Sequence, residues 1–393
     1  MKQPLYFDWG VSMLFGWGVY GLNLLRHWPR VSGAPALSMA QIQLESFAGS
    51  DPLTLRALTD GLVASDAFRV SLAQHGDKKP KLDGLVLYGL GNALSGTQPP
   101  SAGGYKGDMT AAAIFFEDTS LPDVKKKAKD YQLIVTGSSW CEEILRSRGV
   151  DNVATVIQGI DPAVFHPAPR SDLLAGRFAV FSGGKIEHRK AQDLVLLAFK
   201  AFAQRHPEAI LVTAWHSPWP IAAITINRNP AISPISFTES GVDIGGWAAA
   251  NGVGPDQFID LGAIPNHQMA RVLREMDVAL FPNRCEGGTN LVAMECMACG
   301  VPVILSKNTG HLDLTSTGGT YDLDKQAAVI ADDKGTEGWG ESDIEEIVEK
   351  LEQVWRDRAE ARRRAAIAAA AMAEMSWHRQ IGKLHDTLAS HYR

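Results

Sequence analysis

The sequence predicts an α/β protein with two doubly wound, Rossmann-like domains that face a central cleft. Short apolar runs alternate with helix-like segments along almost the whole chain, a pattern typical of parallel sheets covered on both faces. A proline-rich stretch at residues 159–172 interrupts this alternation, which then starts again, as expected for a linker. The chain has 393 residues and a hydrophobic content of 45%, enough for a core in each domain.

In the first half, six strands are expected, with helical stretches between several of them. The expected strands are Val11–Phe15, Val70–Ala73, Leu85–Tyr88, Ala112–Phe116, Leu133–Val135 and Val153–Ile157, and the helical stretches include Pro52–Ala64 and Trp140–Arg148. The second half repeats the pattern after the linker. Strands are expected at Phe178–Ser182, Ile210–Ala214, Phe258–Leu261, Val278–Phe281 and Val301–Leu305, and helices at Ala191–Arg205, Asn266–Met276, Asn290–Cys299 and Asp343–Met375. The predicted domains are 1–168, 169–375 and a final helix at 376–393 that begins after Ser376, an acceptable N-cap.

Composition narrows the class of function. The formal net charge is -6, which disfavours a dedicated nucleic-acid binder. Four cysteines in a chain of this length form no disulfide framework. No apolar run reaches the length of a membrane span, and the start of the chain does not resemble a signal peptide. We therefore expect a cytoplasmic protein, with membrane contact at most peripheral, through the basic run Lys125–Lys129.

Residues Gly16–Gly21 fit the pattern G-x-G-x-x-G after an apolar run. Glycines in such a loop let backbone N–H groups approach a phosphate. A dinucleotide site also needs an acidic residue about 20 positions further on, and the nearest one here is Glu45, 24 residues after Gly21. A tight structural turn and a phosphate- or substrate-facing loop both remain open, and a nicotinamide site is the less favoured alternative.

Residues Ser182–Lys190 follow an expected strand and combine Gly183 and Gly184 with three cations, Lys185, Arg189 and Lys190. A diphosphate needs flexible backbone donors, a helix N-terminus and a long cationic side chain. This segment could supply all three. A surface loop with solvated basic residues fits the composition equally well.

Residues Cys285–Cys299 place glycines between two carboxylates, Glu286 in a loop and Glu295 on the following helix. Carboxylates accept hydrogen bonds from vicinal hydroxyls, so this pair suits a sugar or a ribose, although an isolated glutamate on a short helix is usually solvated. Cys296 and Cys299 match C-x-x-C, but buried packing is favoured over zinc or redox chemistry. No metal-binding histidine spacing occurs.

The second half resembles a retaining nucleotide-sugar glycosyltransferase of family 4, which has the GT-B architecture. The resemblance is carried by Val156–Asp161 with Phe165–Pro167, by Gly184–Lys190 with Asp193, by Glu286–Glu295 with Met297–Ile304, and by Ser376-Trp377. It implies that the last helix crosses back onto the N-terminal domain.

Site residues follow from the resemblance by position. It implies catalytic roles for Lys190, Glu286 and Glu117, and donor-binding roles for Gly18, Gly184, Lys185, Arg189, Lys190, Ala263, Ile264, Gly287, Gly288, Thr289, Asn290, Leu291 and Glu295. Three departures from the family pattern stand out. Lys185 replaces an arginine, eight residues rather than seven separate Glu286 from Glu295, and Glu117 stands near the position of a usual histidine.

The predicted function is a metal-independent, retaining transfer of a sugar from a nucleoside diphosphate sugar to an acceptor hydroxyl. The expected partners are this donor and a glycan, lipid-linked or protein acceptor, with no separate cofactor and no nucleic acid. Two alternatives remain. One is an NAD-linked dehydrogenase or nucleotide-sugar epimerase on a similar scaffold, and the other is a catalytically silent sugar-binding protein.

Overall fold

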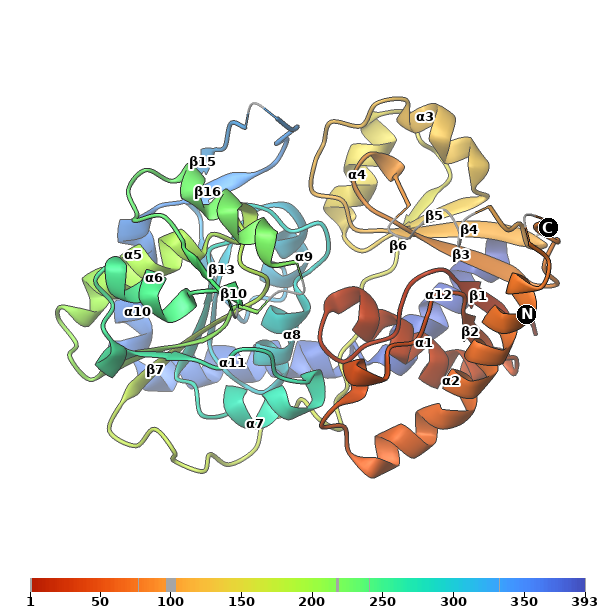
Figure 1. Cartoon of the computed structure of the whole chain (residues 1–393). Helices are drawn as coiled ribbons and strands as arrows, with labels where there is room; N and C mark the ends of the chain where they lie inside the picture. The colour runs from red at the N-terminus through yellow and green to blue at the C-terminus, as the bar shows by residue number, and fades with distance from the viewer. Residues whose placement is uncertain are drawn as a thin grey trace.

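The computed structural model describes residues 2–76, 78–96, 104–216, 219–239, 241–331 and 333–392. Two six-stranded parallel sheets organise the chain, one in each half (Figure 1). The first has the order β2-β1-β3-β4-β5-β6 and the second β11-β8-β7-β12-β13-β14. This arrangement confirms the predicted fold class.

The strands of the first sheet are β1 (Leu5–Phe7), β2 (Ala36–Ser38), β3 (Leu85–Leu90), β4 (Met109–Ile114), β5 (Leu133–Thr136) and β6 (Val153–Thr155). Those of the second are β7 (Phe178–Gly183), β8 (Ala209–Ala214), β11 (Phe258–Asp260), β12 (Val278–Phe281), β13 (Val303–Ser306) and β14 (Tyr321–Leu323). Two small antiparallel pairs, β9 (Phe237–Thr238) with β10 (Gly241–Val242) and β15 (Gln326–Ala328) with β16 (Gly340–Ser342), lie outside these sheets.

The helices of the first half are α1 (Gly16–Ser32), α2 (Pro52–Ala73), α3 (Val124–Lys127) and α4 (Ser139–Ser147). Those of the second half are α5 (Gln192–Ala203), α6 (Ile244–Ala250), α7 (Met269–Leu273), α8 (Leu291–Ala298), α9 (Leu312–Thr315), α10 (Ile344–Arg356), α11 (Arg358–Ala373) and α12 (Trp377–His391). Each half has two clusters of buried apolar side chains. Every residue of β3, β4 and β7 is buried, as expected for a sheet covered on both faces.

Four expectations about single elements are wrong. Val11–Phe15 is an irregular segment before α1, and Val70–Ala73 is the last turn of α2, where the Val70 side chain is 47% exposed. The Asp343–Met375 helix is two helices, because the Asp357 side chain accepts a hydrogen bond from the Glu360 N–H and starts α11. Asn266–Met276 holds a short 3₁₀ turn and the short α7. The sequence interpretation missed β1 and β2, each only three residues long.

The last helix crosses back to the first half (Figure 1). Backbone hydrogen bonds link Ile160 to Met375 and to Trp377, both at 2.9 Å. Trp377, Ile381, Leu384 and Leu388 then join the apolar core of the first half, which includes Trp28 of α1. The boundaries 1–168, 169–375 and 376–393 stay a prediction. No helix in the described part of the chain is both long and apolar enough to cross a bilayer.

A second connection runs through residues 333–340, which we name the strap. The Gly335 carbonyl accepts from the Thr119 N–H at 3.0 Å, and the Gly335 N–H donates to Asp118 at 2.8 Å. The Trp339 indole donates to the Glu117 carbonyl at 2.9 Å. A Cβ on Gly335 would lie 2.4 Å from the Ser120 nitrogen. The strap therefore fits closely against the loop that follows β4.

Candidate active site

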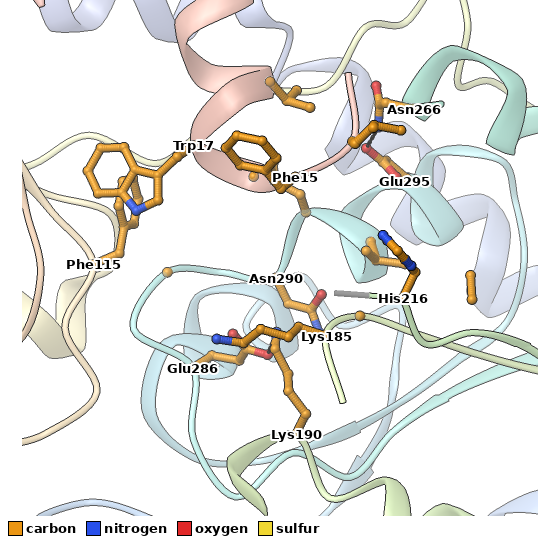
Figure 2. Close-up of a pocket in the computed structure, with 18 of the residues that line it drawn as sticks. Phe15, Trp17, Phe115, Lys185, Lys190, His216, Asn266, Glu286, Asn290 and Glu295 are labelled. Carbon is orange, nitrogen blue, oxygen red and sulfur yellow. Dashed lines mark hydrogen bonds and ion pairs between the residues drawn. The ribbon is translucent and has the colours of Figure 1, made fainter. Parts of the chain in front are cut away.

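A cavity of about 540 Å³ lies between the two halves (Figure 2). Its lining residues follow the ends of several strands, with Gly91 and Phe115 after β3 and β4, and Gly184 and His216 after β7 and β8. Doubly wound sheets bind ligands beyond the carboxyl ends of their strands. The cavity is therefore at the position that the fold class predicts for an active site.

The β7–α5 loop brings three cations to this cavity. Gly184 follows β7 with a φ of +116°, a conformation that favours glycine. Lys185, Arg189 and Lys190 line the cavity. Ala191, with a φ of +58°, then turns the chain into α5. The predicted combination of glycine, cations and helix start is therefore present at one wall of the cavity.

Carboxylates pair with each of these cations. Lys185 approaches Glu187 at 3.0 Å. Arg189 contacts Glu187 at 2.6 Å, and both Glu117 and Glu286 at 3.3 Å. Since Glu117 belongs to the first half and Arg189 to the second, this contact links the two walls. Each of the three cations is therefore held by at least one carboxylate.

Glu286 lies at the centre of this network. Its carboxylate accepts hydrogen bonds from Lys190 and Asn283, and its N–H donates to Thr309. Burial opposes its ionisation, but the charges of Lys190 and Arg189 lower the pKa of Glu286 to about 2. Burial lowers the pKa of Lys190, while Glu286 opposes that change. We therefore assign Glu286 as an ionised side chain fixed against the cations.

Glu295, one turn into α8, has a different environment. It is 4% exposed and accepts a hydrogen bond from Asn266 at 2.5 Å. Burial raises the pKa of Glu295 to about 8, although the Asn266 hydrogen bond lowers it in part. Asn290 caps α8 by accepting from the Ala293 N–H at 3.3 Å. The capped helix end and Glu295 both belong to the cavity lining.

A buried ion pair joins the two loops that carry these groups. Arg284 binds Asp193 through two hydrogen bonds of 2.9 and 2.7 Å, and neither side chain is exposed. The Arg189 carbonyl also accepts from the Arg284 N–H at 2.7 Å. The pair therefore fixes the start of α5 against the loop that carries Glu286.

Most of the residues predicted for the site line this cavity. They are Glu117, Gly184, Lys185, Arg189, Lys190, Ala263, Ile264, Glu286, Gly288, Asn290, Leu291 and Glu295. Gly18, Gly287 and Thr289 do not line it. Gly287 packs on the Phe116 carbonyl, where a Cβ would lie at 2.4 Å, and Thr289 donates to the Met294 sulfur at 3.1 Å.

Gly18 does not line the cavity, and its approach to a phosphate stays a prediction. Gly18 lies in the first turn of α1, where an added Cβ would lie 2.4 Å from the Ser12 Cβ, so its missing side chain allows close packing. Gly21 has a similar role against the Gly10 carbonyl at 3.0 Å. Gly16 lines the cavity instead. The contacts of Gly18 and Gly21 favour the structural-turn interpretation of this motif.

The sequence interpretation missed several residues that position the site: Asn266, Asn283, Arg284, Glu187 and His311. Asn283 and Arg284 follow β12 after Pro282, and their place at the carboxyl end of a predicted strand was a usable signal. His311 contacts Asn290 at 3.2 Å and Ser306 at 2.9 Å, and no sequence pattern indicated it. Within the described ranges, no three His, Cys, Asp or Glu side chains form a group that could hold a metal ion.

Comparison with known proteins gives two kinds of relationship. Residues 264–384 match a family described as "Family 4 Glycosyltransferase in conflict systems". A GDP-mannose-dependent alpha-(1-6)-phosphatidylinositol dimannoside mannosyltransferase of Mycobacterium tuberculosis is 24% identical over 212 residues, which is 52% of this chain and 49% of the relative. The same relative matches from a second strain. The chain thus spans about half the length of the curated relatives it matches.

Solved structures extend the likeness to the whole chain. Sucrose-phosphate synthase from Thermosynechococcus elongatus superposes with a TM-score of 0.64 at 16% identity, covering 99% of this chain and 100% of that one. Trehalose 6-phosphate synthase from Burkholderia multivorans has a TM-score of 0.64 at 13% identity, and the match covers 99% of each chain. Anabaena HepE in complex with UDP and glucose has a TM-score of 0.61 at 13% identity, and the match covers 99% of this chain and 100% of that one.

Residues 264–384 are similar to the family 4 glycosyltransferases, and the whole chain has the GT-B fold. The recognition made from the sequence motifs is therefore confirmed. In a GT-B protein the two sheets face each other across the cleft, and here that cleft holds the cations, Glu286 and Glu295.

Proposed function

We propose that this chain transfers a sugar from a nucleoside diphosphate sugar to an acceptor hydroxyl, with retention of configuration and without a metal ion. One observation carries the proposal. A single cavity at the carboxyl ends of both sheets combines Lys185, Arg189 and Lys190 with the buried carboxylates Glu286 and Glu295. A nucleoside diphosphate sugar needs cations for its diphosphate and acceptors for its sugar and ribose hydroxyls.

The cationic residues act on the diphosphate, which is the leaving group of the reaction. In the transfer, the acceptor oxygen forms a bond to the anomeric carbon, and the bond from that carbon to the diphosphate oxygen breaks. The acceptor proton leaves with the diphosphate. Negative charge grows on the diphosphate as it departs, so Lys185, Arg189 and Lys190 stabilise the transition state more than the bound donor.

The carboxylates bind the neutral parts of the donor. Glu295 accepts from the ribose hydroxyls, and Glu286 accepts from the transferred sugar. We assign Glu117 to the acceptor side, a role supported by its position in the cavity lining contributed by the first half. The N-terminus of α8, next to Gly288 and Asn290, adds backbone donors and a partial positive charge. Metal independence is proposed because three cations can offset the roughly two negative charges of a diphosphate.

A donor screen followed by turnover tests the proposal. Bound donor raises the melting temperature by mass action, so we expect a shift with one of the UDP, GDP, ADP or dTDP sugars. Release of the nucleoside diphosphate should persist in excess EDTA. Lys190→Ala should lower turnover by about 10- to 100-fold, because a charge-assisted contact contributes roughly 1.5–3 kcal/mol.

Retention is tested by the anomeric configuration of the product in NMR spectra. Loss of activity on chelation, with recovery on adding Mg²⁺, would refute the metal-independent mechanism. Wild-type turnover of Lys190→Ala would refute its assignment to the diphosphate. Absence of any donor binding would refute the proposed function as a whole.

A further inference from the structure

The two walls of the cavity differ in chemistry. The wall from the second half carries the cations and the buried carboxylates. The wall from the first half is mostly apolar, and its side chains are Met13, Leu14, Phe15, Trp17, Val19, Asn92, Phe115, Glu117 and Gln158. Among these described lining residues of the first half, Glu117 is the only charged one, and none is Lys, Arg or His. Figure 2 shows Phe15 and Trp17 across the cavity from Lys190 and Glu286.

Three rings, Phe15, Trp17 and Phe115, form what we name the aromatic wall. Each is partly exposed and lines the cavity. The Trp17 and Phe115 rings meet edge to face, with their centroids 4.8 Å apart. An uncovered aromatic surface in a cavity gains free energy when a ligand with an apolar face covers it.

Buried aromatic rings support Trp17 and Phe115, whereas the Phe15 ring meets the Trp219 ring of the second half, with centroids 5.7 Å apart. The ring centroids of Trp9 and Trp17 are 5.0 Å apart, and those of Tyr20 and Phe115 are 6.1 Å apart. Tyr20 in turn stacks on Trp377 of α12 at 5.8 Å. Trp9, Tyr20 and Trp377 are all buried. Because their supporting rings are buried, Trp17 and Phe115 form a preorganised surface, which lowers the cost of ordering on binding.

Building on the proposed transfer reaction, we propose that the acceptor is a neutral sugar whose ring lies against the aromatic wall. The C–H face of a sugar ring carries partial positive charge, which suits the negative face of an aromatic ring. The hydroxyls at the rim of the sugar then meet Asn92, Gln158 and Glu117, which can donate or accept hydrogen bonds.

The same wall disfavours a phosphorylated acceptor. A phosphate group held there would have no cation beside it on its own wall, and Glu117 would face it. The cations of the opposite wall already pair with Glu117, Glu187 and Glu286, and in the reaction they hold the donor diphosphate. Burying an unpaired phosphate carries a large desolvation cost. The site therefore selects neutral acceptors over charged ones.

Paired acceptor probes test this inference. Release of nucleoside diphosphate is measured with the donor found in the screen and with glucose, mannose, fructose, their 6-phosphates, and neutral di- and trisaccharides. We expect at least one neutral sugar to raise release above the rate in water, and its phosphorylated partner to be at least about 10-fold less effective. Equal or better use of a 6-phosphate would overturn the proposal. So would donor hydrolysis that no neutral sugar accelerates.

Matched variants separate the wall from the donor site. Trp17→Leu and Phe115→Leu should raise the KM for the neutral acceptor about 10-fold, which corresponds to one lost aromatic contact. Their affinity for UDP or GDP should stay within about 2-fold. Phe237→Leu removes an exposed aromatic ring outside the cavity and is the control. An unchanged acceptor KM in both wall variants would refute the aromatic wall as the acceptor site.

A gain of function gives a second readout. Leu14 is 39% exposed and lines the cavity. Leu14→Lys adds a cation to the first-half wall, whose described lining residues include none, and should reduce the preference for the neutral probe over its 6-phosphate at least about 3-fold. An unchanged preference would contradict the electrostatic part of the proposal. If no donor binds at all, it is the transfer function that fails, whereas intact donor turnover with the wrong acceptor preference refutes only this inference.

Discussion

Two glutamates in one cavity have opposite protonation behaviour. Glu286 contacts Lys190 and Arg189, and its pKa falls to about 2 although it is buried. Glu295 is equally buried, but it accepts its hydrogen bond from the neutral Asn266, and burial raises its pKa to about 8. Burial alone therefore does not decide the charge of a carboxyl group. A cationic neighbour does, and the sequence spacing of the two glutamates could not reveal it.

Glu295→Gln should change both nucleotide binding and the pH dependence of stability. In the wild type the folded state holds a proton on Glu295 up to about pH 8, whereas the ordinary pKa is 4.5. The folded state thus binds more protons than the unfolded state between these values, and the stability falls as the pH rises through this window. In the variant, the free energy of unfolding lacks this fall with pH, because glutamine does not titrate. The variant should therefore gain more than about 1 kcal/mol relative to the wild type between pH 5 and pH 8.

Chemical denaturation at several pH values measures this difference, with the exposed Glu143→Gln as the control. If the free energy of unfolding changed with pH equally in the wild type and in Glu295→Gln, a neutral buried Glu295 carboxyl would be contradicted. Calorimetry with UDP or GDP gives the second readout. Glu295→Gln should weaken nucleotide binding, because ribose is common to donor and product, whereas Glu286→Gln should mainly reduce turnover.

At the scale of elements, the second sheet was easier to predict than the first. Strands β7, β8, β12 and β13 are continuous apolar runs that are almost entirely buried, and periodicity detects such runs. Strands β1 and β2 have three residues each, too few for any periodic signal. The apolar residues Val11–Phe15 gave a false strand, because they are needed for the core and the cavity wall rather than for a sheet.

The candidate site was predictable where a motif lies in one stretch of chain, as in Gly184–Lys190. It was not predictable where contacts join distant segments. Asp193 and Arg284 are 91 positions apart and form the buried pair between the two loops. Asn266 reaches Glu295 from a turn that the sequence interpretation assigned to a helix. Long-range side-chain pairs of this kind leave no periodic pattern in the sequence.

Asp193→Asn tests how strongly the buried pair fixes these elements. Removing the Asp193 carboxylate leaves the buried Arg284 with the half-exposed Glu341 as its remaining ion-pair partner, at 2.6 Å. We therefore expect a cost near the lower end of the roughly 3–5 kcal/mol typical of a broken buried pair. We expect a marked loss in the free energy of unfolding and weaker donor binding. The control is Asp333→Asn, which breaks the exposed pair with Arg228 and should cost less than about 1 kcal/mol. Similar losses in the two variants would contradict the structural role of the Asp193–Arg284 pair.

At the scale of the whole molecule, the strap connects the halves beside the active site. Gly335→Ala introduces a Cβ at 2.4 Å from the Ser120 nitrogen, so the strap cannot keep its contacts with Asp118 and Thr119. Since these residues follow Glu117 and Phe115, the first-half wall should shift. We expect transfer to fall about 10-fold, as misplacement of reacting groups predicts, while affinity for UDP or GDP stays within about 2-fold.

Small-angle scattering should show a larger radius of gyration for Gly335→Ala in the presence of donor. Gly254→Ala is the matched control, because an added Cβ there has nothing within 4 Å. If Gly335→Ala transfers sugar at the wild-type rate, the strap does not position the wall. A parallel loss of nucleotide affinity would instead indicate general destabilisation of the second half.

The packing of α12 against α1 has a consequence for folding during translation. Tyr20 and Trp28 receive their partners Trp377 and His385 only after roughly 200 further residues beyond Ile160 have been made. At about 5–20 residues per second, this interval is roughly 10–40 s. During it, the nascent first half presents an uncovered aromatic surface, so the part of the aromatic wall that rests on Tyr20 becomes rigid only after α12 has been made.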